Sequence, residues 1–63
     1  MWPAVEALLA RSRSLLDKMP GADREEAVAL HEQLHTAMEH GRSDDVIRLA
    51  KDLEDFLFFI EER

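Results

Sequence analysis

The residues VIRLAKDLEDFLFFI, positions 46–60, carry the clearest structural pattern of this 63-residue chain. Their apolar side chains recur at steps of three and four residues, which places them on one stripe of an α-helix. Ser43 suits the cap of this helix, and the acidic Asp44 and Asp45 suit its first turn, where negative charge complements the helix dipole. The pattern predicts a helix over residues 44–62, with an inward stripe of Val46, Leu49, Ala50, Leu53, Phe56, Leu57 and Ile60.

Two more segments with the same periodicity precede this one. The first has a stripe of Val5, Leu8, Leu9, Ser12, Leu15, Leu16 and Met19, and the second has a stripe of Ala27, Leu30, His31, Leu34, Ala37 and Met38. Ser12 is the one polar member of the first stripe. We interpret it as a packing notch whose hydroxyl bonds back to a carbonyl of its own helix.

Glycine and proline separate the three segments. Pro3 suits the first turn of a helix, Pro20-Gly21 ends the first segment, and Gly41 supplies a left-handed stop to the second. Asp23 with Glu26 resembles a capping box that starts the second segment. These signals predict helices over residues 3–18 and 24–40. Because short loops favour antiparallel neighbours, the predicted fold is all-α, a small antiparallel three-helix bundle.

Composition limits both the core and the partners. Residues 1–63 form a single domain at most, and a chain of this length buries only about 60% of the surface that it exposes when unfolded. The absence of cysteine removes disulfides and thiolate metal sites and favours a cytoplasmic location. A net charge of −6 repels phosphate backbones, so we expect no nucleic-acid partner. We also expect no membrane partner, because no apolar run approaches the roughly 20 residues of a membrane span.

The pentapeptide HEQLH, residues 31–35, has the His-Glu-x-x-His spacing on which many zinc proteases hold their metal. Its two imidazoles would share one helical face, and Glu54 offers a third ligand. However, His31 falls within the apolar stripe that the bundle must bury, and Glu32 points toward solvent rather than toward a metal-bound water. We interpret His31 as a core-edge histidine and His35 as a boundary one. We therefore expect no catalytic residue, no metal ligand and no cofactor.

The run FLFFI, residues 56–60, contains more apolar surface than one helical face can bury. Phe58 points to the same side of the helix as Ile47, and Phe59 points to the other flank. In one interpretation, both phenylalanines fold over the ends of the bundle and pack on Trp2 and the first helix. In the other, they form a contact surface for an identical chain or for another protein. The candidate interface residues are Trp2, Ile47, Phe56, Phe58 and Phe59.

Most of the chain, residues 5–60, resembles the C-terminal helical lid of DnaK-type, 70-kilodalton heat-shock chaperones. The resemblance rests on Leu15-Leu16, on the acidic start DREE at 23–26, on the stop from Ala37 to Gly41, on the restart at Asp44-Asp45 and on the closing helix from Leu49 to Leu57. It implies a non-catalytic lid that helps to gate polypeptide binding. It also implies that the chain is a C-terminal fragment of a longer protein whose nucleotide-binding and substrate-binding parts lie elsewhere.

The predicted function is therefore that of a helical module of this lid type, which is not an enzyme. Its expected partner is protein, either unfolded polypeptide or the rest of a chaperone chain, and the third helix is expected to form a homodimer. The alternative is a stand-alone adaptor or regulator that docks its aromatic third helix on a partner protein.

Overall fold

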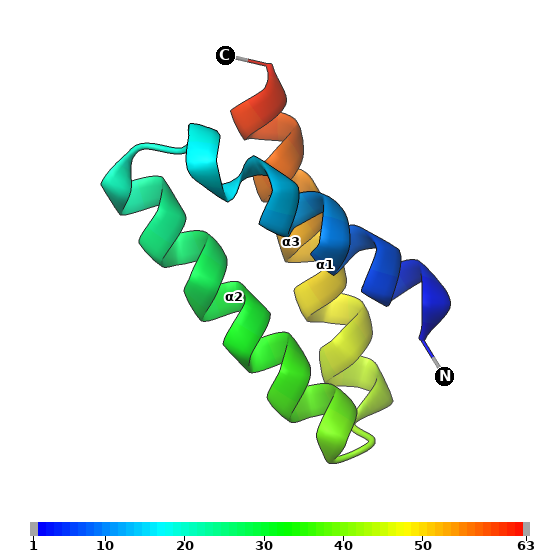
Figure 1. The fold of residues 1–63 in the computed structure, drawn as a ribbon. Coiled ribbons are helices and arrows are strands. Elements are labelled where there is room, and N and C mark those ends of the chain that lie inside the picture. The colour runs from blue at the N-terminus through cyan, green and yellow to red at the C-terminus, as the bar shows by residue number, and fades with distance from the viewer. Residues whose placement is uncertain (1, 63) are drawn as a thin grey trace.

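The computed structural model describes residues 2–62, which form three α-helices and one short 3-10 turn. The elements are α1 (Pro3–Leu15), the 3-10 turn η1 (Leu16–Lys18), α2 (Gly21–Glu39) and α3 (Ser43–Glu61). α2 and α3 run antiparallel along one another, and α1 lies obliquely across α3 (Figure 1). The predicted small all-α three-helix bundle is thus confirmed. The molecule measures 32 × 18 × 16 Å.

The core is built from the three stripes that the sequence predicted. Its buried apolar residues are Leu9, Met19, Ala27, Leu34, Ala37, Val46, Leu49, Leu53 and Leu57. Leu34 on α2 and Leu53 and Leu57 on α3 are completely shielded from solvent. Because complete burial of one leucine stabilises the fold by roughly 1.5–3 kcal/mol, these three side chains make the contact between α2 and α3 the main source of stability. The helix α1 adds Leu9, with the half-buried Val5 and Leu8 packed beside it.

Gly41 ends α2 in the conformation that the sequence predicted. Its φ of 64° lies in the left-handed region, where a Cβ atom is strained. The Gly41 N–H donates to the Met38 carbonyl at 3.2 Å, and the Arg42 N–H donates to the Ala37 carbonyl at 2.9 Å. These two bonds are those of a Schellman motif, which satisfies the last carbonyls of the helix. The chain can then reverse within three residues and begin α3 at Ser43.

The junction between α1 and α2 differs from the prediction. The α-helical geometry of α1 ends at Leu15, and the last turn tightens into η1, because Pro20 forces the preceding Met19 into an extended conformation. α2 then starts at Gly21, three residues before the predicted start at residue 24. The Pro20 carbonyl accepts the Arg24 N–H at 2.9 Å. Pro20 is therefore the cap residue of α2.

The predicted side-chain caps are accordingly wrong. Asp23 lies in the first turn of α2 rather than at its cap, so the Asp23–Glu26 capping box does not form. Ser43 is the first residue inside α3, and the cap residue is Arg42, whose carbonyl accepts the Val46 N–H at 2.9 Å. In both cases the tight turn before the helix sets its first residue, and an unfavourable cap is tolerated because tertiary packing holds the helix.

The two glycines of the chain provide a matched test of the turn at residue 41. Substitution Gly41→Ala should destabilise the fold by about 1 kcal/mol, because it places a Cβ atom on a residue with positive φ. Substitution Gly21→Ala should be neutral or stabilising by up to about 1 kcal/mol, because a Cβ atom at this helical position meets no atom within 4 Å. Urea unfolding followed by circular dichroism measures both. Equal effects of the two substitutions would contradict the assigned role of Gly41.

Candidate interaction surface

The HEQLH pentapeptide lies on α2, and its two histidines have different surroundings. His31 is buried, with 8% of its surface exposed, and its Nε2 atom lies 2.6 Å from the Oγ atom of Ser12 on α1. His35 is exposed, which differs from the boundary position that the sequence predicted. The expected placement of His31 within the bundle is correct, and its ring serves as a polar contact between α1 and α2.

Ser12 is completely buried, in agreement with the predicted packing notch. Its hydroxyl, however, contacts the His31 ring on another helix, instead of a carbonyl of its own helix as we expected. The two residues are the polar members of two apolar stripes. This shared property is the feature of the sequence from which their contact could have been predicted. Within residues 2–62, every buried side-chain nitrogen or oxygen atom has a hydrogen-bond partner, so this pair leaves no unmet polar group in the core.

Electrostatics favour the neutral form of the His31 ring. Burial lowers the pKa of His31 from its ordinary value of 6.5, and the positive charge of Arg13 lowers it further, with a smaller contribution from His35. Residues 2–62 contain no group of three or more His, Asp or Glu side chains placed to hold a metal ion. Glu54, the third ligand that the zinc alternative would require, lines a groove between α1 and α3.

Three large apolar side chains on α3 are exposed: Ile47 (64%), Phe58 (64%) and Phe59 (57%). The interpretation in which Phe58 and Phe59 fold over the ends of the bundle is therefore wrong for this structure. The helical period explains the result, because the inward side of α3 is already filled by Val46, Leu53 and Leu57, among others. The interface interpretation of the FLFFI run stays a prediction.

The other two candidate interface residues, Trp2 and Phe56, are half-buried and pack against the core. Trp2 lies just before α1, at one side of the groove between α1 and α3. This α1–α3 groove has a volume of about 530 Å³ and is mainly apolar, with Trp2, Ala4, Val5, Ala7, Leu8 and Arg11 on the α1 side and Val46, Ile47, Ala50, Lys51 and Glu54 on the α3 side. Ile47 thus belongs both to the groove and to the exposed apolar face of α3.

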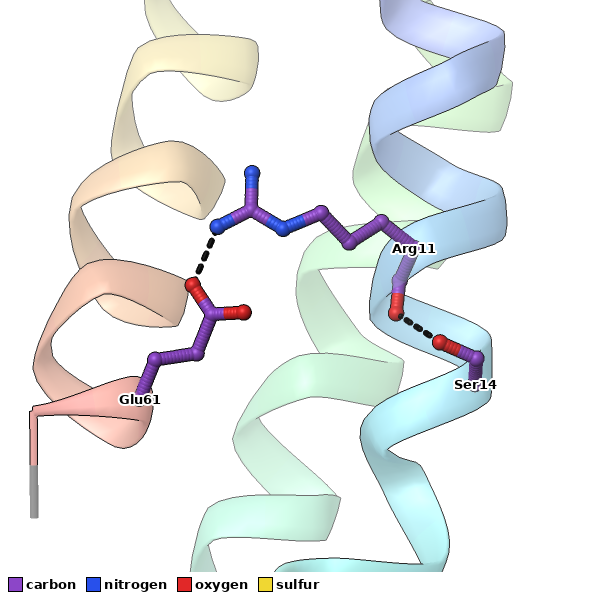
Figure 2. A network of polar contacts seen from close by, with 3 residues as sticks. All are labelled: Arg11, Ser14 and Glu61. Carbon is purple, nitrogen blue, oxygen red and sulfur yellow. Dashed lines mark hydrogen bonds and ion pairs between the residues drawn. The ribbon is translucent and has the colours of Figure 1, made fainter.

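An ion pair joins α1 to the C-terminal end of α3. The Arg11 guanidinium on α1 donates to the carboxylate of Glu61, the last residue of α3, and the Ser14 hydroxyl donates to the Arg11 carbonyl at 2.7 Å (Figure 2). The hydrogen bond to Glu61, with the negative charges of Glu61 and Glu54, raises the pKa of Arg11. Both side chains are largely exposed, and such pairs contribute little stability. The pair links α1 to the last residue of α3.

Comparison of the chain with protein-family models, with curated proteins and with solved structures found no match. The resemblance to chaperone lids therefore stays a prediction. No helix within residues 2–62 is long and apolar enough to cross a membrane.

Removal of the Ser12 hydroxyl should be costly. Ser12→Ala leaves the buried Nε2 atom of His31 without its partner, and an unsatisfied buried polar group costs about 1–3 kcal/mol. Chemical unfolding of the variant measures this loss. Ser14→Ala is the control, because Ser14 is exposed and its hydroxyl bonds only within α1. A loss at Ser14 equal to that at Ser12 would show that the contact with His31 is not the cause.

His31 should make the stability of the fold depend on pH. Because the folded state holds His31 with a lowered pKa, the unfolded state binds more protons below the ordinary value of 6.5. The stability that the neutral His31 ring contributes should therefore be fully present well above pH 6.5, and it should be lost as the pH falls through 6.5 toward the lowered pKa of the folded state. His31→Gln, which can still bond Ser12 but does not titrate, should flatten this dependence in thermal unfolding. His35→Gln, at an exposed position, should leave it in place; an unchanged slope in His31→Gln would refute the assignment.

Proposed function

We propose that this chain is a non-catalytic helical module that works by binding another protein chain through the outward face of α3. One observation carries the proposal: Ile47 and Phe58 are each 64% exposed on the same side of one helix. They lie eleven residues apart, which is about three helical turns or 16 Å. Complete burial of one such side chain is favourable by roughly 1.5–3 kcal/mol, so a partner that covers both would gain substantially.

The α1–α3 groove also supports the assignment of this side of α3 as the binding surface. It is mainly apolar, and Ile47 connects it to the exposed face of α3. An amphipathic helix from a partner can therefore cover the groove and Phe58 together, which is the helix-in-groove mode of recognition. Lys51 and Glu54, also exposed on α3, lie between Ile47 and Phe58 along the helix and supply polar contacts of both signs within that surface.

The proposal assigns no reaction to the HEQLH residues. The His31 ring is engaged by Ser12 inside the bundle, where a substrate has no access to it. A role as the lid of a DnaK-type chaperone is a more specific form of the same proposal. In that role, the protein chain that binds to α3 is an unfolded polypeptide. A chain without cysteine suits a cytoplasmic setting for this module.

Photo-crosslinking tests the proposal in cells that produce the chain. Phe58 replaced by p-benzoylphenylalanine keeps an aromatic side chain at the proposed contact, and illumination should give a discrete adduct with a protein, either a second copy or a different chain. The control places the same group at Glu25, an exposed position on α2, and should give no discrete adduct. Failure of the Phe58 variant to yield an adduct, or the same adducts from both positions, would overturn the proposal.

A further inference from the structure

The outward face of α3 carries apolar and charged side chains in a regular order. Ile47, Lys51, Glu54 and Phe58 follow one another at steps of four, three and four residues, and all four are exposed. These are the steps between successive a and d positions along a coiled coil, so the four side chains form one continuous row, which we call the α3 seam. The α3 seam has an apolar side chain at each end, with a base and an acid between them.

We infer that the α3 seam binds the α3 seam of a second copy of this chain, in antiparallel orientation. The inference rests on the proposed function, because it names the partner of the same face. A two-fold axis between Asp52 and Leu53 brings Ile47 opposite Phe58 of the second copy. The same axis brings Lys51 opposite Glu54 of the second copy. Because the axis repeats each contact, the four seam residues of the two copies form two apolar pairs and two ion pairs.

The charge order of the α3 seam decides the orientation. In a parallel pair each residue would face its own copy, so Lys51 would face Lys51 and Glu54 would face Glu54. Like charges held opposite one another at an interface are unfavourable, whereas the antiparallel pair places Lys51 opposite Glu54 and Glu54 opposite Lys51. The flanks are compatible with this register: Arg48 and Asp55 lie exposed beside the seam, and Arg48, which contacts Asp45 of its own helix at 3.4 Å in the single copy, comes to face Asp55 of the second copy.

The next seam position toward the start of α3 is Asp44, which in this register faces Glu61 of the second copy. That carboxylate is already paired with Arg11 of its own chain, so the two acids do not meet as uncompensated charges. The ion pair between α1 and α3 thus offsets part of the repulsion between these two acids at the edge of the proposed interface.

The α1–α3 groove gives the incoming aromatic ring a place to bind. Trp2 and Ile47 both line this groove, and the antiparallel register brings Phe58 of the second copy to Ile47. The residues around that point include Ala4 and Ala50, whose small side chains permit close approach of another helix. Phe58, exposed in a single copy, therefore becomes covered by the groove of its partner.

Charge exchange on the α3 seam tests this arrangement by sedimentation equilibrium of the purified chain at physiological salt. The net charge of −6 on each copy opposes association, and a Debye length of about 8 Å screens that long-range repulsion more than it screens pairs in contact. Lys51→Glu and Glu54→Lys should each weaken dimerisation by roughly tenfold or more, because each creates like-charge contacts twice over. The double variant Lys51→Glu/Glu54→Lys should restore dimerisation to near the original strength.

An equal mixture of the two single variants should form a mixed dimer, because one chain then presents two acids and the other two bases.

Helical content of every variant, measured by circular dichroism, should match the original chain, because both positions are exposed. A chain that stays monomeric at millimolar concentration would overturn the inference, and so would single variants that dimerise as well as the original, or a double variant that does not recover. If the chain is monomeric while the Phe58 crosslinker captures a different protein, the second copy is excluded and the proposed function stands. If no adduct forms at all, the proposed function fails as well.

Discussion

The packing of α2 against α3 is the interaction on which the rest of the molecule depends. Leu34, Leu53 and Leu57 have no exposed surface, and the Schellman turn at Gly41 holds the two helices in antiparallel register. A chain of 63 residues without cysteine has no covalent link to add to this contact. Because the inward side of α3 is filled completely, any further apolar side chain on that helix is displaced to its outer face. The exposure of Phe58 follows from the same packing that makes the bundle stable.

Much of this fold could be predicted from the sequence, because helical periodicity and glycine act locally. The three stripes identified every buried apolar residue of the core, and Gly41 marked the end of α2. The starts of α2 and α3 could not be predicted in the same way. Asp23 and Ser43 are good cap residues in isolation, but the turns at Pro20 and Gly41 place the first helical residue elsewhere.

The candidate site was predictable in part. Periodicity showed that the FLFFI run exceeds one face, and the structure exposes Phe58 and Phe59 accordingly. The α1–α3 groove could not be foreseen, because it depends on the oblique angle at which α1 lies on α3. The bond between Ser12 and His31 was missed for a related reason. Each residue stood out on its own helix, but which side chains of two helices meet depends on their relative position along the bundle. A fully satisfied polar pair of this kind favours one alignment of α1 on α2 over its neighbours.

Trp2 adds an optical property to this arrangement. It is the single tryptophan of the sequence, and it is half-buried at the side of the α1–α3 groove. The intrinsic fluorescence of the chain therefore originates from one indole whose remaining water contact is lost when the groove is filled. Occupation of the groove should therefore shift that emission to the blue, without any added label.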